Sequence, residues 1–116
     1  MGKAEEFRAY RERMNARILE QGSLVTRRFF NLDTRCYEPG ALDSKTKELL
    51  GLTASTVLRC DDCISYHVLR CLEMEATRAE IQEALDVALV VGGSIVIPHL
   101  RRVHELLDEV APVEAS

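Results

Sequence analysis

The middle of the chain contains a helical segment that carries no charged residue. From Leu49 to Leu58 every residue is apolar or small, and the flanking charges are Glu48 and Arg59. A helix without a polar face has to be surrounded by protein on all sides. The segment therefore predicts a core built of helices, into which Glu48 is drawn as the one buried carboxylate.

The first forty residues also show helical periodicity. Four apolar residues lie three or four positions apart in a charged stretch, and we interpret them as the packing face of an amphipathic helix: Phe7, Tyr10, Met14 and Ile18. After Gly22 the pattern resumes and runs from Leu24 to Leu32. The segment from Asn31 to Gly40 is predicted to be a loop, because the pair Pro39-Gly40 favours turns.

Capping residues predict where later helices begin. Asp43 or Ser44 can accept hydrogen bonds from the N–H groups of a first turn, so one helix begins there and contains the uncharged segment. Thr77 and Glu80 form a capping box, in which each side chain bonds the other residue's backbone N–H, so another helix begins at this point.

Glycine and proline predict the remaining boundaries. The pair Gly92-Gly93 ends or kinks one helix, and a last helix with Pro98 near its start ends near Val110. No segment is convincing as a strand. We therefore predict an all-α fold, a compact bundle of about five to six helices in a single domain over residues 1–116, with an N-terminal helical segment over residues 1–40.

The composition of the chain excludes several classes of partner. A net charge of -4 argues against a nucleic-acid-binding protein, since such proteins usually carry a basic excess. No run approaches the roughly 20 apolar residues of a membrane-spanning helix, and the mixed charges of residues 1–10 are unlike a signal peptide. We therefore expect a cytoplasmic protein that has neither a nucleic acid nor a membrane as its partner.

Cysteine is the residue type that points most directly to chemistry. In a reducing cytoplasm a close cysteine pair is more often catalytic or metal-binding than structural. Cys60, Cys63 and His67 lie at i, i+3 and i+7, which places them along one stripe of a helix. A helix N-terminus favours the thiolate, and His67 can exchange protons near neutral pH. Cys36 and Cys71 have no partner at motif spacing, and we expect both to be inert buried thiols.

Two acidic residues complicate the chemistry of the cysteine pair. Asp61 and Asp62 lie between the two cysteines, where their negative charge opposes a thiolate. A dedicated base is therefore required, and His67 and the buried Glu48 are the candidates. The other two histidines, His99 and His104, are expected at the surface or at an interface.

Together these residues resemble the signature of a known family. Glu48, eleven intervening residues and the motif C-x-x-C-x-x-x-H of Cys60, Cys63 and His67 are similar to the core of the carboxymuconolactone decarboxylase / alkylhydroperoxidase D (AhpD-like) family. The resemblance includes the flanking residues 42–49 and 76–93 and covers about residues 41–107, so that 41–110 form the expected family core. Some redox-active members carry histidine or an aromatic residue where this chain has Asp62.

The resemblance implies a thiol-dependent oxidoreductase with peroxidase activity of the peroxiredoxin, antioxidant type. Its site would consist of Cys60 and Cys63 as a redox pair with Glu48 and His67 as a proton relay, and a hydroperoxide or a protein disulfide would be the substrate. No tightly bound cofactor is implied. An external dithiol or a redox protein, such as a lipoyl-bearing protein, would restore the thiols, and a peroxiredoxin is the other partner that the resemblance implies. Position in the helix favours Cys60 as the exposed thiol and Cys63 as the one nearer the base.

Two other functions are open from the residues alone. One is lactone decarboxylation, the other branch of the family, although proton transfer at carbon does not need a dithiol. The other is a non-enzymatic zinc-binding helical module, with Cys60, Cys63, His67 and Glu48 as its four ligands. We favour the redox function, mainly on the resemblance and also because a second Cys or His pair at zinc spacing is missing.

The uncharged helices also predict an assembly. A small domain leaves most of its helices half exposed, yet Leu49–Leu58 and Val87–Val91 have no polar face. Further copies of the chain can supply the missing cover, and the resemblance implies a homotrimer or a homohexamer. We expect at least three copies, with Cys60 and Cys63 near a subunit boundary. The rival is a monomer that is covered by its own first forty residues.

Overall fold

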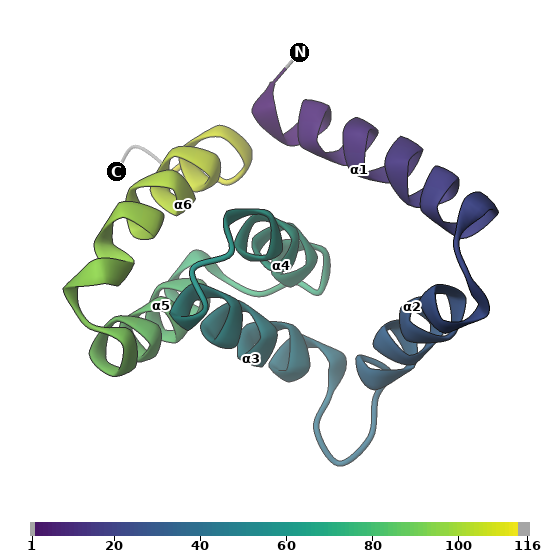
Figure 1. The fold of residues 1–116 in the computed structure, drawn as a ribbon. Helices are drawn as coiled ribbons and strands as arrows, with labels where there is room; N and C mark the ends of the chain where they lie inside the picture. The colour runs from purple at the N-terminus through teal and green to yellow at the C-terminus, as the bar shows by residue number, and fades with distance from the viewer. Residues whose placement is uncertain (1, 114–116) are drawn as a thin grey trace. The chain divides into compact units, whose positions relative to one another are not determined.

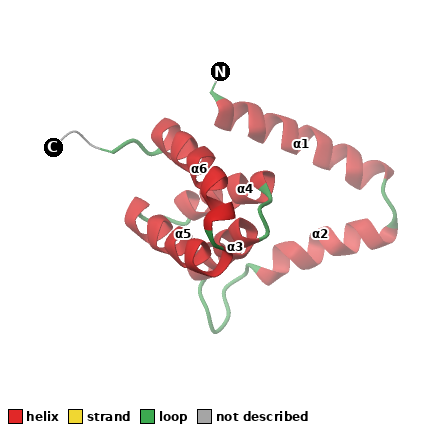
Figure 2. Cartoon of the chain, turned by 60° about the vertical axis from the view of Figure 1, so that its left-hand side comes forward, coloured by secondary structure: helices red, strands yellow, loops and turns green. Residues whose placement is uncertain are grey.

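The computed structural model describes residues 2–113, which contain only helices and their connections (Figure 1, Figure 2). The α-helices are α1 (Lys3–Gln21), α2 (Leu24–Cys36), α3 (Ser44–Val57), α4 (Asp61–Glu73), α5 (Arg78–Gly92) and α6 (Ile97–Val110), with a short 3-10 helix at Ser94–Val96. Over this range the all-α prediction and the predicted number of helices are confirmed. None of the helices in the described range is both long enough and apolar enough to cross a membrane.

The chain divides into two compact units, residues 1–38 and residues 39–116. The first unit contains α1 and α2. Gly22 follows α1, and Ser23 begins α2 by accepting a hydrogen bond from the Thr26 N–H at 3.3 Å. Arg27 of α2 donates to the carbonyl oxygens of Leu19 and Gly22 at the end of α1, where carbonyls lack helical partners. An arginine side chain thus closes the turn between the two helices.

Helix α2 extends further than the sequence predicts. It continues through Asn31 to Cys36, so the prediction of a loop beginning at Asn31 was wrong for these residues. Within this stretch Thr34 donates its hydroxyl to the Phe30 carbonyl at 3.1 Å, as a threonine inside a helix does. Proline restricts the residue directly before it, and the Pro39-Gly40 pair therefore does not disturb the helix several residues upstream.

Helix α3 lies between α4 and α5 at the centre of the second unit (Figure 1). Its N-cap is Asp43, whose carboxylate accepts the Thr46 N–H at 2.8 Å, as the sequence predicts. Lys45 in its first turn forms an ion pair at 2.8 Å with Glu80 in the first turn of α5. The buried cluster around α3 is aliphatic apart from one cysteine: Leu52, Ile64, Val68, Cys71, Ala76, Ile81, Leu85, Val103 and Leu107.

Helices α5 and α6 begin and end at the predicted residues. The capping box of α5 has both of its bonds, from the Glu80 N–H to the Thr77 hydroxyl at 3.1 Å and from the Thr77 N–H to the Glu80 carboxylate at 2.8 Å. Gly93 follows α5 with a φ of 83°, a conformation that favours glycine. Pro98 lies in the first turn of α6, where its missing N–H costs no helical bond.

The uncharged segment is not buried on every side within the second unit. Leu52 and Thr56 of α3 are buried, but Leu50 is exposed and Leu58 is 76% exposed. On α5, Ile81, Leu85 and Ala88 are buried, whereas three valines are exposed: Val87, Val90 and Val91. The expectation that these helices lie wholly inside protein is therefore not met by the second unit alone.

We expect further copies of the chain to cover these apolar side chains, because soluble monomers seldom leave several large aliphatic side chains in water. Light scattering at micromolar concentration should give the mass of at least three chains. Val90→Glu should lower that mass, whereas Glu83→Gln, a change at an exposed polar residue of the same helix, should leave it unchanged. A wild-type mass near 13.1 kDa would contradict the prediction and favour cover by residues 1–38.

Candidate functional site

The junction between α3 and α4 positions the first cysteine. Two backbone bonds close α3, from the Arg59 N–H to the Thr56 carbonyl at 3.0 Å and from the Cys60 N–H to the Ser55 carbonyl at 3.2 Å. This pair of bonds is a Schellman motif, which needs a left-handed residue, and Arg59 supplies it with a φ of 59°. Cys60 is also the N-cap of α4. Because one residue ends α3 and begins α4, Cys60 has little backbone freedom.

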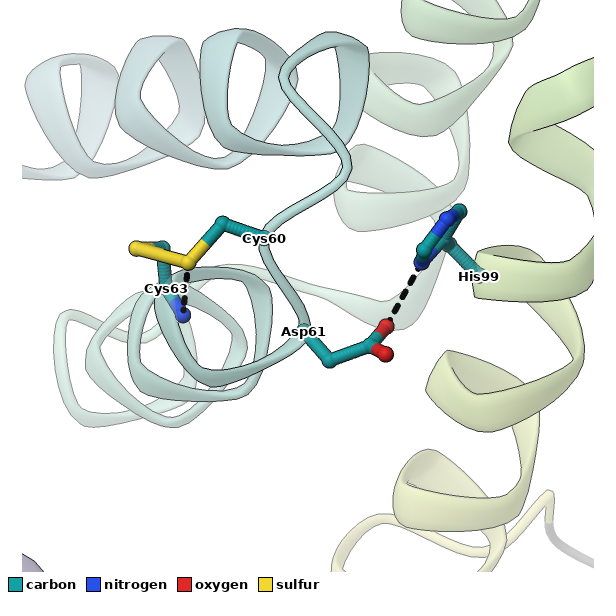
Figure 3. Close-up of a disulfide and its surroundings, with 4 residues drawn as sticks. All are labelled: Cys60, Asp61, Cys63 and His99. Atoms are coloured by element: carbon teal, nitrogen blue, oxygen red, sulfur yellow. Dashed lines mark hydrogen bonds and ion pairs between the residues drawn. A yellow bond between two sulfur atoms is a disulfide. The ribbon is translucent and has the colours of Figure 1, made fainter.

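Cys60 and Cys63 form a disulfide at the N-terminus of α4 (Figure 3). Their Cα atoms are 5.3 Å apart, and Cys60 Sγ accepts the backbone N–H of Cys63 at 3.3 Å. The predicted order of exposure was wrong, since Cys63 is exposed and Cys60 is half-buried. The reason is the cap geometry, in which an N-cap side chain bends over the first turn to accept its N–H groups.

Glu48 of α3 and His67 of α4 meet in the interior of the second unit. Glu48 is 1% exposed and His67 is 8% exposed, and Glu48 Oε1 lies 2.8 Å from His67 Nδ1. An ionised carboxylate can only accept, so Nδ1 carries the hydrogen and the neutral ring has its proton-accepting lone pair on Nε2. The contact therefore fixes the tautomer that a general base would need.

A third residue, which the sequence analysis missed, completes the surroundings of Glu48. Arg70 Nε donates to Glu48 Oε2 at 3.2 Å, so that both carboxylate oxygens accept a bond from α4. Arg70 also forms an ion pair with Glu73 in the same helix. The signal that points to Arg70 is its spacing of three residues from His67, which places both side chains on one face of α4.

The carboxylate of Asp61 is directed toward α6 and away from the sulfur atoms (Figure 3). His99 Nδ1 lies 2.7 Å from Asp61 Oδ1, and Arg102 Nη1 lies 3.2 Å from Asp61 Oδ2. His99 is therefore half-buried against Asp61 within the chain instead of lying fully at the surface, whereas His104 is exposed as expected. An interface position for His99 stays a prediction. The contact joins α4 to α6, which no short-range pattern in the sequence relates.

The two remaining cysteines differ in their surroundings. Cys71 is buried, and this burial, with the charges of Glu48 and Glu80, raises the pKa of its thiol to about 12. Such a thiol does not ionise at neutral pH, which agrees with the expected inertness. Cys36 is exposed, so the expectation of a buried thiol was wrong for it, because α2 contributes no buried residue at all.

The four residues predicted to form the site lie as two joined pairs. Cys60 bonds to Cys63 and Glu48 contacts His67, and the one-turn spacing of Cys63 and His67 on α4 relates the pairs. Within residues 2–113, no three or more His, Cys, Asp and Glu side chains are grouped so as to hold a metal ion. The arrangement presents an oxidisable thiol pair on the helix that also carries a proton-transfer pair.

Residues 23–105 match the model of the Carboxymuconolactone decarboxylase family. The match begins before residue 41 and takes in α2, which the resemblance drawn from the sequence did not include. The motif residues that carried the resemblance all lie after residue 41, so they held no information about α2.

Two solved structures and one further protein are similar to the chain. A carboxymuconolactone decarboxylase family protein from Thermotoga maritima, whose description raises involvement in an antioxidative response as a possibility, is 60% identical with a TM-score of 0.87, over 90% of this chain and 89% of that one. Another family member, from Legionella pneumophila in its apo form, is 26% identical with a TM-score of 0.83, over 92% of this chain and 96% of that one. An uncharacterised protein of the cox locus of Paracoccus denitrificans is 30% identical over 77% of this chain and 80% of its own length.

Arg70→Gln should destabilise the fold, because it leaves the Glu48 carboxylate with its bond to His67 but without its bond to Arg70. We expect the free energy of unfolding to fall by about 1–2 kcal/mol, as for a lost hydrogen bond to a charged group at a partly exposed site. Urea unfolding followed by circular dichroism measures the change. Glu73→Gln removes only the other ion pair of Arg70 and should cost less than about 0.5 kcal/mol. Equal losses in the two variants would show that the bond to Glu48 contributes nothing.

Proposed function

The chain belongs to the carboxymuconolactone decarboxylase family, and on this premise we propose that it is a thiol oxidoreductase that reduces hydroperoxides or protein disulfides through Cys60 and Cys63. The observation that carries the proposal is the disulfide between these cysteines at the start of α4. One of its sulfurs belongs to an exposed residue, which gives an external dithiol access to the bond. The antioxidative role raised for the similar Thermotoga protein supports a peroxide as substrate.

In the reduced state Cys63 is the attacking thiol, because it is the exposed cysteine and lies one turn from His67. Nε2 of His67 takes the thiol proton, and the Glu48 carboxylate at Nδ1 stabilises the imidazolium that results. The thiolate attacks the terminal oxygen of the hydroperoxide, so that an S–O bond forms while the O–O bond breaks. The departing alkoxide takes the proton from His67, and the products are an alcohol and a sulfenic acid on Cys63.

Cys60 resolves the sulfenic acid. Its sulfur attacks the sulfur of Cys63, the S–O bond breaks, and the hydroxide leaves as water with the proton of the Cys60 thiol. The bond between Cys63 N–H and Cys60 Sγ favours negative charge on the resolving sulfur. The product is the disulfide between residues 60 and 63.

Two electrons and two protons from an external dithiol return the protein to its reduced state. A lipoyl-bearing protein is the reductant that the family resemblance suggests for this step, and a peroxiredoxin is the other partner it suggests, as a protein disulfide that the Cys60–Cys63 dithiol reduces. The cycle uses no tightly bound cofactor, since the electrons are held by the two sulfur atoms.

Thiol counting tests the redox pair. One equivalent of hydroperoxide should remove two of the four thiols in the reduced wild-type protein, while Cys60→Ser and Cys63→Ser should each abolish the double loss. Cys71→Ser is the matched control and should retain it, because Cys71 does not ionise at neutral pH. Retention of the double loss in both Cys60→Ser and Cys63→Ser would sink the proposal.

The same variants assign the attacking thiol. In Cys60→Ser the sulfenic acid on Cys63 has no resolving partner and should be trapped by a carbon nucleophile such as dimedone. Cys63→Ser should give no such adduct at residue 60. The reverse pattern would assign the attack to Cys60 instead.

Substitution of the relay residues should slow oxidation without unfolding the protein. Glu48→Gln keeps size and hydrogen bonding but removes the charge behind His67, and His67→Ala removes the base, so each should lower the rate of peroxide-driven thiol loss by about 100-fold or more. Stopped-flow thiol assays across neutral pH measure the rates, with His104→Ala as the control at an exposed histidine. Wild-type rates in both relay variants throughout that range would show that the two residues relay no proton.

A further inference from the structure

A carboxylate next to Cys60 is tied to a different helix. Asp61 is the first residue of α4, and its Oδ1 lies 2.7 Å from His99 Nδ1 while its Oδ2 lies 3.2 Å from Arg102 Nη1, both on α6. The side chains of His99 and Asp61 are 15% and 44% exposed, so water reaches this pair only in part. Figure 3 shows the Asp61 carboxylate leaving the side of the helix that carries the sulfur atoms and reaching His99.

The direction of this side chain matters because negative charge develops on the cysteines. A carboxylate beside a thiolate repels it and so disfavours ionisation of the thiol. Asp61 Oδ1 lies at hydrogen-bond distance from His99 Nδ1, and Asp61 Oδ2 forms an ion pair with Arg102, whose side chain keeps its positive charge at any accessible pH. Asp62, the other acidic residue of the motif, is exposed, where water and salt screen its charge. Asp61 is thus the less exposed of the two carboxylates, and its negative charge is the one that side chains of α6 compensate.

We propose that His99 and Arg102 are positioning residues for the cysteine pair, because they hold the Asp61 carboxylate on α6, away from the sulfur atoms, and compensate its charge. The inference rests on the proposed function, since it concerns the reduced and reactive state of the same pair. It assigns a part in the chemistry to α6, a helix that contributes no residue to the C-x-x-C-x-x-x-H motif. Asp61 keeps its favourable place in the first turn of α4 while its charge is directed away from the thiols.

Removal of the His99 and Arg102 side chains should affect both the rate at which the thiols react with a peroxide and the equilibrium between the disulfide and the dithiol. Without them the Asp61 carboxylate is uncompensated beside the cysteines, and a thiolate there becomes less stable. Two electrons and two protons convert the disulfide to the dithiol, and a less stable thiolate makes the reduced state less favourable. The variants should therefore be harder to reduce with dithiothreitol and slower to react with a peroxide.

The test is a titration of the reduced protein, followed by the ultraviolet absorbance of the thiolate, in a Cys36→Ser background. Cys71 stays protonated because burial raises the pKa of its thiol to about 12, so the signal reports Cys60 and Cys63. His99→Gln and Arg102→Gln should each lower the thiolate fraction at neutral pH roughly three- to tenfold, since one pKa unit corresponds to a factor of ten. His104→Gln, at the exposed histidine of the same helix, should leave the titration unchanged.

A charge-removing variant separates compensation from packing. In an Asp61→Asn background there is no charge to compensate, so His99→Gln should have no further effect on the titration. If His99→Gln lowered the thiolate fraction equally with Asp61 and with Asp61→Asn, the proposal would be overturned. A His99→Gln protein that titrates like His104→Gln would also overturn it. Should His99→Gln fail to fold by circular dichroism, Arg102→Gln carries the test, because that side chain is 61% exposed.

The outcome is independent of the substrate. The thiol titration and the equilibrium with dithiothreitol use no peroxide, so they decide the role of His99 and Arg102 whether or not a peroxide is the substrate. A wild-type protein that fails to reduce hydroperoxides and protein disulfides would count against the proposed function alone.

Discussion

A carboxylate buried among helices is costly unless both of its oxygens have partners, and the second unit is organised around one such group. Taking an ion of this kind out of water costs several kcal/mol, which fixed charged and polar partners have to offset. Glu48 finds them in His67 and Arg70, both on α4. A shift of α3 along α4 by one turn would break both contacts, so the pairing fixes the register of the two helices. The same contact orients the imidazole ring that the proposed chemistry needs.

The backbone restrains the cysteines, just as the hydrogen bond to Glu48 restrains the ring of His67. Cys60 closes α3 through its N–H and begins α4 as its N-cap, after a left-handed Arg59. A residue shared by two caps cannot move without breaking backbone bonds at both helix ends. The sulfur of Cys60 therefore has a rigid support, and what is left to tune its reactivity is the charge around it, including Asp61 and the donors of α6.

Features that depend on near neighbours in the chain were predictable. The capping box of Thr77 and Glu80, the cap at Asp43 and the break at Gly93 each involve residues within one helical turn, and all lie where the sequence predicts them. The prediction that α2 ends before Asn31 was wrong, because turn signals act only on adjacent residues. The prediction that residues 49–58 are fully buried is not met within one chain, because side-chain polarity alone does not show how many neighbouring helices one chain provides.

The same distinction between local features and contacts made by packing applies to the candidate site. The sequence alone determined the candidate set Glu48, Cys60, Cys63 and His67, because its residue types and their spacing along the chain resemble a family signature and can be recognised without a structure. Only the tertiary structure decided their partners: Arg70 on the second oxygen of Glu48, and His99 with Arg102 on Asp61. Side-chain pairs between helices depend on how the helices pack, and packing is set by the shapes of many residues together. A contact between residues 61 and 99 therefore leaves no mark in the spacing of the sequence.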